Sequence, residues 1–304
     1  MRVKEVQSKR HPVLNWRVLG YVLDSPRDNA MTNKERFYPE MRFGGFSAVD
    51  GTVAFFTRVN ALLDPSFIVL DVGCGRGEYS EDRVLPRKNL RILKGKAARV
   101  IGIDVDQGAR DNPFVDEFRL LQGDIWPVES DSIDLVVCDN VIEHISTPDR
   151  LFSELRRVLK NGGYLCIRTP NRWSYVAMAA TLVPNRYHSK VTAAVQGVRK
   201  EEDVFPTLYR CNSIRRLRNI MKKHGFQAVV YSCEAEPSYL TFSTVAYFLG
   251  VMHQRFAPHF IKSPLLAFGR VAKDTPAREG PEGKPVPSPD QEKIGRDRPE
   301  SARP

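Results

Sequence analysis

Glycines separated by single residues follow a short apolar run near residue 70, and acidic residues stand on both sides of them. The segment reads Val69-Leu70-Asp71-Val72-Gly73-Cys74-Gly75-Arg76-Gly77-Glu78. Glycine permits a tight turn and a close approach of the backbone to a ligand, where a Cβ atom would collide. A loop of this kind after a buried strand is typical of a cofactor site at the carboxyl edge of an α/β sheet.

The spacing and charge of this loop distinguish between two kinds of cofactor. Dinucleotide-binding loops follow the pattern G-x-G-x-x-G/A and place a pyrophosphate on the N-terminus of the next helix. Here Gly77 comes one residue early, Glu78 takes the place of the third glycine, and Asp71 precedes the loop. Carboxylates on both sides repel a pyrophosphate and attract an ammonium or sulfonium group. We therefore expect S-adenosylmethionine (SAM), with an NAD(P)-dependent oxidoreductase as the alternative.

Further carboxylates follow the next two apolar runs. Asp104 comes near the end of the run 100–105, where a carboxylate can accept hydrogen bonds from the paired hydroxyls of a ribose. Because SAM and NAD both contain this ribose, Asp104 does not separate them. Asp124 and the backbone N–H of Ile125 are placed to contact an adenine, and the Ile125 side chain to pack on it. The alternative for that pair is a turn with a solvated aspartate.

Glu143 and His144 follow a fourth apolar run, where the transferable methyl group should lie. His144 can take a proton from an acceptor hydroxyl, and Glu143 can orient it. We therefore take both as the candidate catalytic residues. The alternative is that they cap and orient the loop before Thr147.

Alternating strand and helix signals provide the framework for these residues. Short, near-continuous apolar runs predict buried strands at residues 67–72, 100–105, 118–122, 133–138, 164–168, 227–233 and 265–271. Helical periodicity or capping signals predict helices at residues 47–63, from Thr147-Pro148 to a stop at Asn161-Gly162-Gly163, and at 213–223. This alternation predicts a doubly wound α/β sheet.

Taken in order, these motifs resemble the class I SAM-dependent methyltransferases, close to the type 11/23 group that includes ubiquinone-pathway O-methyltransferases. The matching segments are VLDVGCGRG, VIGIDVD, LLQGDIW, IDLVVCDNVIEHI and LKNGGYLCIRTPN, which lie within residues 67–171. They are specific for SAM binding and much less so for the substrate. The resemblance implies a Rossmann-like, seven-stranded, mostly parallel sheet with helices on both faces and a reversed last hairpin.

The resemblance also implies which residues contact the cofactor. The loop from Asp71 to Gly77 would hold the methionine moiety, Asp104 the ribose, and Asp124 with Ile125 the adenine. The expected cofactor-binding residues are Asp71, Gly73, Cys74, Gly75, Gly77, Asp104, Val105, Asp124, Ile125, Asp139 and Asn140.

Some relatives of this kind use the pattern E-x-x-E-H with a distant histidine to bind a catalytic metal. Here Asn140 stands at the first position of that pattern, and amide oxygens are weaker ligands for a hard divalent cation than carboxylates. His188 is a candidate for the distant imidazole, although its position alone proves nothing. We therefore expect no catalytic metal.

Two long segments outside the motifs, at about 172–210 and 236–262, are expected to be insertions that shape the acceptor side. Both combine apolar stretches with flanking cations, which suits an amphipathic, phosphate-bearing acceptor or a membrane surface. A lipid-linked sugar, a quinone precursor or an envelope glycan intermediate would fit. The run from Tyr239 to Met252 has the length of a buried helix, so we interpret it as a core helix covering the sheet.

The expected function is therefore methyl transfer from SAM to a hydroxyl of a small-molecule, lipid-linked or glycan-linked acceptor. A non-catalytic SAM-binding regulator and an RNA 2′-O-methyltransferase are the alternatives. The formal net charge of +10 favours anionic partners without choosing among them. Because the basic residues are dispersed and no zinc finger or aromatic platform motif occurs, we do not expect nucleic acid as a partner.

Cysteines and termini complete the expectations. The five cysteines show no C-x-x-C spacing and suit a reduced compartment, and the polar N-terminus lacks the apolar region of a secretory signal. We expect a cytoplasmic protein, with peripheral membrane contact as an extension of that view.

The sequence also predicts how the chain is divided. Residues 1–45 should form a partly ordered N-terminal extension and 46–271 the methyltransferase domain. Residues 272–304 are rich in proline and charge and should be disordered.

Overall fold

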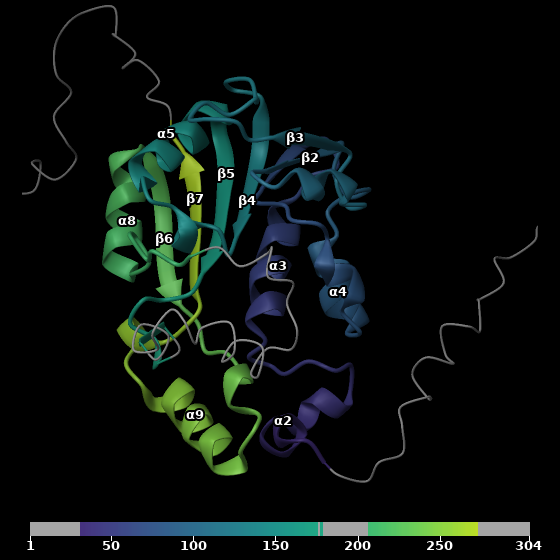
Figure 1. Cartoon of the computed structure of the whole chain (residues 1–304), viewed down its shortest axis with the longest axis vertical. Coiled ribbons are helices and arrows are strands. Elements are labelled where there is room, and N and C mark those ends of the chain that lie inside the picture. The colour runs from purple at the N-terminus through teal and green to yellow at the C-terminus, as the bar shows by residue number, and fades with distance from the viewer. Residues whose placement is uncertain (1–30, 176, 179–205, 273–304) are drawn as a thin grey trace, which may run out of the picture.

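Seven strands form one sheet in the order β3-β2-β1-β4-β5-β7-β6 (Figure 1). The computed structural model describes residues 31–175, 177–178 and 206–272. The strands are β1 (Ile68–Val72), β2 (Arg99–Asp104), β3 (Glu117–Leu120), β4 (Ile133–Asp139), β5 (Leu159–Thr169), β6 (Phe226–Ser232) and β7 (Leu265–Val271). Strands β1 to β5 pair in parallel, whereas β7 runs antiparallel to both β5 and β6. The predicted Rossmann-like sheet with a reversed last hairpin is confirmed.

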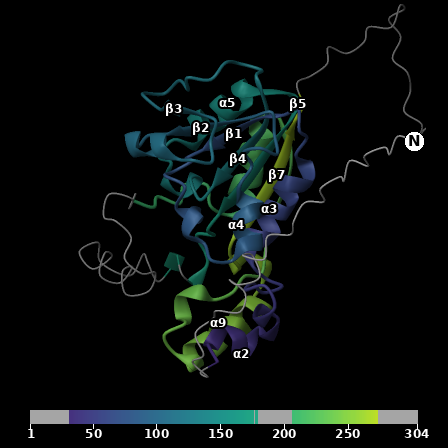
Figure 2. The same ribbon diagram turned by 90° about the vertical axis from the view of Figure 1, so that its right-hand side faces the viewer.

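Helices cover both faces of the sheet, as predicted (Figures 1 and 2). One core cluster packs α5 (Pro148–Val158) and α8 (Ile214–Lys223) against the strands through side chains such as Phe152 and Met221. The other cluster contains Phe55 and Phe56 of α3 (Gly51–Leu62), and α4 (Leu85–Arg91) packs beside it. Helix α3 begins four residues after the predicted start because the Asp50 carboxylate caps it, accepting from two backbone N–H groups.

The end of α5 differs from the expectation. The helix ends at Val158, and Asn161-Gly162-Gly163, which we expected to close it, belong to β5. Leu159 is fully buried and pairs with Ile133 of β4, so the chain enters the sheet at once. Burial of Leu159 in the sheet core therefore decides where α5 ends and β5 begins. The two glycines lie where the pairing of β4 with β5 is irregular.

The carboxyl ends of β1, β4 and β5 meet at one edge of the sheet, and the remaining helices lie beyond it (Figure 1). These are α2 (Asn33–Phe37) and α9 (Thr244–Phe256). Short 3-10 turns connect the larger elements: η1 (Pro39–Arg42), η2 (Glu78–Glu81), η3 (Gln107–Asp111), η4 (Ile142–His144), η6 (Ser238–Leu240) and η7 (His259–Ile261). Among the described helices, none has both the length and the apolar character required to cross a membrane.

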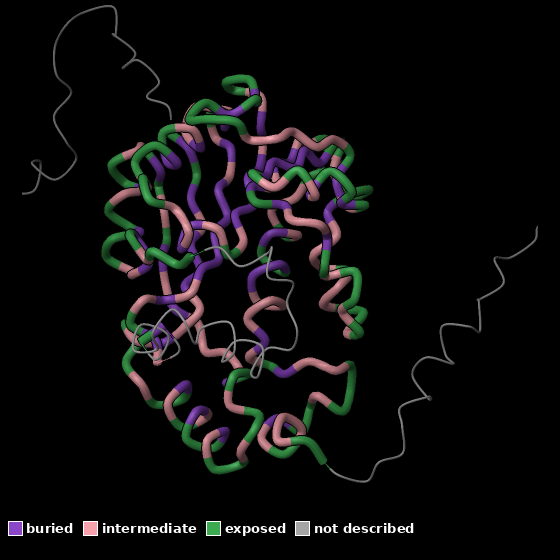
Figure 3. The backbone as a smooth tube through the Cα atoms, viewed as in Figure 1, coloured by how far each residue is buried: buried purple, intermediate pink, exposed green. Residues whose placement is uncertain are grey.

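Helix α9 is not the core helix that its apolar sequence led us to expect. It lies beyond the edge of the sheet and packs on α2, and several of its large apolar side chains are exposed (Figure 3). Phe37 of α2 contacts Tyr247 of α9, with ring centroids 5.5 Å apart. The length of the apolar run was compatible with burial, but no sheet surface is left for it, because α3, α4, α5 and α8 already cover both faces.

The predicted terminal segments are described only in part. Residues 1–30 and 273–304 lie outside the described residues, and so do 176 and 179–205 of the first predicted insertion. Residues 31–45 of the N-terminal extension form α2 and η1 and contact α9.

Candidate functional site

The glycine loop after β1 has the conformation that glycine alone adopts without strain. Gly73, Gly75 and Gly77 have φ angles of 66°, 55° and 78°. The Gly73 N–H donates to Ile103 O at 2.8 Å, which ties the loop to the end of β2. A Cβ atom on Gly73 would lie 2.5 Å from Val141 Cγ2, so the loop is pressed against the segment that follows β4.

Cys74 contributes to this loop mainly through its backbone. Its side chain is buried in the core cluster beneath α3, close to Gly102 of β2. Burial raises the pKa of the Cys74 thiol, and Asp71 and Asp104 add to this effect. A neutral, buried thiol packs as a small apolar group, so only its peptide is placed to face a cofactor.

Asp104 holds the glycine loop through hydrogen bonds and also lies where a ribose is expected to bind. Its Oδ2 atom accepts from the Gly75 N–H at 2.9 Å, and Oδ1 accepts from the Asp106 N–H at 2.9 Å. Asp106 in turn accepts from Arg76 Nε at 2.9 Å. The predicted ribose ligand is therefore also the residue that holds the loop and the end of β2 in one arrangement.

Three carboxylates give this edge of the sheet a negative field. The pKa of Asp71 is raised to about 7 by burial, then by Asp139, with a smaller contribution from Asp104, while Arg91 opposes the rise. The charge argument from the sequence relied on Asp71 and Glu78. Because Glu78 is exposed to solvent, its charge is screened and it contributes less than the buried carboxylates. A surplus of carboxylates in a poorly solvated place suits a ligand with an ammonium or sulfonium group.

Asp139 is engaged by an arginine that sequence reasoning missed. Arg168 Nε and Nη2 donate to Asp139 Oδ1 and Oδ2, both at 2.7 Å, and Nη1 donates to Thr52 Oγ1. Asn140 has a positive φ of 56° and donates from Nδ2 to Asp139 Oδ1 at 3.0 Å. The signal that could have revealed it is an arginine at the end of the apolar run of a buried strand, which requires a buried acidic partner.

Three further residues expected to bind the cofactor lie after β2 and β3. The side chains of Val105 and Ile125 are both largely exposed and provide apolar surface there. The Asp124 carboxylate accepts from Arg150 Nη1 at 2.5 Å, and both side chains of this ion pair are exposed. Contact of Asp124 and Ile125 with an adenine, and of Val105 with the cofactor, stays a prediction.

Glu143 lies in η4 and is 4% exposed, beneath the acceptor side of the site. Its Oε2 atom accepts from the Thr169 hydroxyl at 2.9 Å, and Asn212 Nδ2 donates to that hydroxyl at 2.6 Å. Burial raises the pKa of Glu143 to about 7, although the hydrogen bond from Thr169 opposes the rise. Glu143 therefore titrates near neutral pH, as expected for a group that handles protons.

His144 is oriented by a backbone carbonyl. Its Nδ1 lies 3.1 Å from Pro206 O, and because a carbonyl only accepts, this contact requires a proton on Nδ1. In the neutral ring Nε2 then carries the lone pair, which makes Nε2 the basic atom. Nε2 lies 4.0 Å from Glu143 Oε1, beyond a hydrogen bond but close enough to stabilise a protonated ring.

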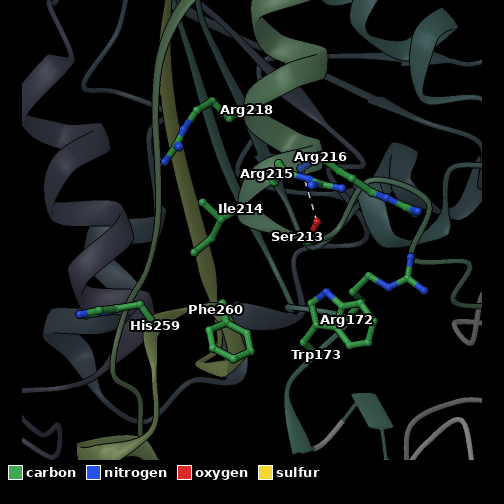
Figure 4. Close-up of a pocket in the computed structure, with 9 residues that line it drawn as sticks. All are labelled: Arg172, Trp173, Ser213, Ile214, Arg215, Arg216, Arg218, His259 and Phe260. Atoms are coloured by element: carbon green, nitrogen blue, oxygen red, sulfur yellow. Dashed lines mark hydrogen bonds between the residues drawn. The ribbon is translucent and has the colours of Figure 1, made fainter.

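One pocket in the described part of the chain is lined by arginine (Figure 4). It has a volume of about 840 Å³ and lies between the start of α8, the loop after β5 and η7. Its lining residues are Arg172, Trp173, Ser213, Ile214, Arg215, Arg216, Arg218, His259 and Phe260. We call it the arginine pocket. No residue of the glycine loop lines it, so it is separate from the expected cofactor site.

Hydrogen bonds link the arginine pocket to Glu143. Ser213 lines the pocket and follows Asn212, the residue that donates to Thr169, which in turn donates to Glu143. The Arg172 N–H, from the opposite wall, donates to Asn212 O at 2.9 Å. A ligand in this pocket would therefore lie beside the polar network that positions Glu143.

The residues at this edge of the sheet suit SAM. Within residues 31–175, 177–178 and 206–272, no group of three or more His, Cys, Asp and Glu side chains could hold a metal ion. His188 lies outside the described residues. The open backbone of the glycine loop, the braced Asp104 carboxylate and the negative field around Asp71 suit an adenosine joined to a cationic amino acid.

Comparison with known proteins agrees with this chemistry. A family model described as a methyltransferase domain matches residues 47–231. A curated protein from Mycolicibacterium smegmatis, described as a probable S-adenosylmethionine-dependent methyltransferase, is 32% identical over 135 residues, covering 42% of this chain and 47% of that protein. A ubiquinone biosynthesis O-methyltransferase from Hahella chejuensis is 31% identical over 117 residues, covering 36% of this chain and 45% of that protein. The chain thus spans about half the length of these relatives.

Solved structures were also compared with the chain. A Thermotoga maritima protein, described as a SAM-dependent methyltransferase and possible histamine N-methyltransferase, aligns with a TM-score of 0.44 and 18% identity. The alignment covers 79% of this chain and 94% of that protein.

Proposed function

The chain belongs to this methyltransferase-domain family, and we propose that it transfers a methyl group from SAM to a hydroxyl of an anionic, partly apolar acceptor. The acceptor is a small molecule or a group linked to a lipid or glycan. The observation that carries the proposal is the pair Glu143 and His144 at the carboxyl end of β4, beside the glycine loop and linked to the arginine pocket.

The cofactor side of the proposal assigns separate tasks to the residues at this edge. The backbone of Gly73 to Gly77 approaches the methionine moiety, and the Asp104 carboxylate accepts from the ribose hydroxyls. The carboxylates of Asp71 and Asp139 favour the cationic groups of the cofactor. When bound, SAM supplies a methyl carbon activated by a sulfonium, so that attack by the acceptor oxygen breaks the carbon–sulfur bond and leaves S-adenosylhomocysteine.

On the acceptor side, one proton passes from the acceptor hydroxyl to His144. His144 Nε2 takes the hydroxyl proton as the oxygen attacks, while Pro206 O continues to accept from Nδ1. Glu143 Oε1 then faces a charged ring 4.0 Å away and stabilises it. Thr169 and Asn212 keep the Glu143 side chain in place throughout, which makes them positioning residues.

The arginine pocket supports the choice of an anionic acceptor. Arg215 and Arg216 lie in the first turn of α8, where cations are ordinarily unfavourable because the helix dipole is positive there. Among the described residues, none of the four pocket arginines forms a salt bridge with a carboxylate. A phosphate-like group at this position would offset the unfavourable helix dipole and would pair with the arginines. Trp173 and Phe260 offer apolar surface to the rest of the acceptor.

The test uses the purified full chain, methyl-labelled SAM and a whole extract of the source cell, separated into lipid, polysaccharide, metabolite, protein and nucleic-acid fractions. We expect label in the lipid, polysaccharide or metabolite fraction, in material retained by an anion exchanger. The Gly75→Val variant, which should bind SAM poorly, measures the background of label that does not depend on the cofactor site. Label in RNA would replace the proposal with RNA methylation. SAM binding without any label would support a non-catalytic SAM-binding regulator instead.

A further inference from the structure

Helix α9 carries its apolar and polar residues on unexpected faces. Tyr247, Gly250 and Gln254 are buried against the rest of the molecule, and two of these three contribute polar side-chain atoms. The opposite stripe is exposed and consists of Val245, Phe248, Leu249, Met252 and Phe256. Residues spaced by three, four and seven positions share one helix face, so these five form a continuous apolar surface.

Contacts on the inner side fix this orientation of α9. Asn33 of α2 donates to Thr241 O at 3.1 Å and accepts from the Thr244 hydroxyl at 2.7 Å. The ring of Tyr247 lies 5.5 Å from that of Phe37 and is fully buried. Rotating α9 to bury its apolar stripe would break these contacts. The exposed stripe therefore belongs to the folded arrangement and needs a partner of its own.

Further exposed aromatic side chains lie near both ends of α9. Phe242 precedes the helix and Phe260 follows it in η7, and both are mostly exposed. Together with the five side chains of the helix stripe they form what we call the α9 surface. It lies beyond the carboxyl edge of the sheet, at the end of the molecule that holds the candidate site (Figure 1).

The charged residues of the segment that contains α9 and η7 all have one sign. Residues 237–273 contain no Asp or Glu, whereas Arg255 and His259 are exposed beside the apolar side chains. Phe260 also lines the arginine pocket, so the apolar surface continues directly into a cationic one. An apolar, aromatic surface bordered by cations complements an anionic lipid surface, where aromatic rings occupy the boundary between headgroups and acyl chains.

We propose that the α9 surface docks the protein on an anionic phospholipid bilayer, with α9 lying in the interface. A second copy of the chain fits less well, because a two-fold interface would bring the same cations of both copies together. On a bilayer, Arg255 and the pocket arginines meet lipid phosphates instead, while the five apolar side chains of α9 leave water.

Docking in this orientation would bring the arginine pocket to the membrane. Asn171, just after β5, donates from Nδ2 to Phe260 O and Lys262 O, both at 2.8 Å, which joins the α9 surface to the strand end near Glu143. A lipid-linked acceptor could then enter the pocket from the bilayer. That last step rests on the proposed function, whereas the docking itself does not.

Vesicle flotation of the full chain tests the proposal. We expect the wild-type chain to float with phosphatidylcholine vesicles that contain phosphatidylglycerol, and binding to weaken as salt rises. Val245→Glu on α9 should weaken this binding about tenfold or more. Val229→Glu is the matched control, because Val229 is 65% exposed on β6 and Val245 is 70% exposed on α9. It should leave flotation unchanged.

Unchanged SAM affinity in both variants would show that they fold, and Leu249→Glu provides a second variant on the same surface. No flotation of the wild-type chain would overturn the proposal, as would equal losses in the two valine variants. A dimer in light scattering that Val245→Glu converts to monomer would assign the surface to a second copy instead. Since SAM binding and methyl transfer are read separately, failure of docking is distinguishable from failure of the proposed activity.

Discussion

Arg168 holds Asp139 through two parallel hydrogen bonds of 2.7 Å, across the carboxyl ends of β5 and β4. The guanidinium is almost buried, and it also lies over the rings of Phe55 and Phe56 of α3, 5.6 and 5.7 Å from their centroids. Two strands and a helix therefore converge on one cation. Asp139 also adds to the effect of burial in raising the pKa of Asp71.

Replacing Arg168 by methionine should destabilise the chain by about 3–5 kcal/mol, since the buried Asp139 carboxylate loses its partner. Chemical denaturation followed by circular dichroism measures this difference. Lys223→Met is the control, because it removes an ion pair with Asp149 whose side chains are both exposed, so that little loss of stability is expected. Equal losses in the two variants would contradict the structural role of Arg168.

Gly75→Val should weaken SAM binding by about 100-fold or more, because a branched side chain would occupy the space beside the backbone that the cofactor needs. Gly95→Val is a matched control. Gly95 also has a positive φ, of 80°, but lies in the turn before β2 with open space around its Cβ position. Both variants share the backbone strain, so calorimetric titration with SAM isolates the effect at the loop. Wild-type affinity in Gly75→Val would refute the loop assignment.

Glu143→Gln should change how stability depends on pH. The folded-state pKa of Glu143 is about 7, above its ordinary value of 4.5, so between these values the folded chain retains a proton that the unfolded chain releases. The wild type therefore loses stability as pH rises through this window, and the glutamine variant lacks this loss. The free energy of unfolding of the variant relative to wild type should rise by up to about 3 kcal/mol from pH 4.5 to 8. Parallel stability profiles from urea denaturation would contradict the raised pKa.

His144→Ala should leave SAM affinity unchanged and lower turnover on a hydroxyl acceptor by about 100-fold, the usual contribution of a general base. His224→Ala is the control, since His224 pairs with Asp149 at the far end of α8. Normal turnover in His144→Ala would exclude His144 as the base.

Replacing Arg215 and Arg216 by alanine should raise KM for an anionic acceptor about tenfold or more and leave SAM affinity unchanged. The control is the double replacement of Lys222 and Lys223 by alanine, which removes the same charge from the opposite end of α8. Inorganic pyrophosphate should compete with the acceptor in the wild type but not in the arginine variant. Equal KM values in the two double variants would rule out the arginine pocket as the acceptor's anion site.

Local patterns in the sequence were enough to predict the framework. The strands of the parallel part of the sheet were visible mostly as apolar runs, because parallel strands buried on both faces need continuous apolar residues. The loop from Gly73 to Gly77 was visible as well, since its positive φ angles restrict those positions to glycine. Asp71 and Asp104 were found because each lies near the carboxyl end of such a run. Each of these features depends on residues that are close together in the sequence, so it can be recognised without the tertiary structure.

Contacts between distant segments could be decided only by the tertiary structure. Asp139 and Arg168 face each other because β4 and β5 pair in that register, and no local pattern specifies a register between strands. The tautomer of His144 depends on the carbonyl of Pro206, 62 residues away. Helix α9 is apolar in the sequence, yet which side it buries depends on α2 and on the absence of free sheet surface. Periodicity determined which elements form, whereas their mutual packing determined which side chains meet.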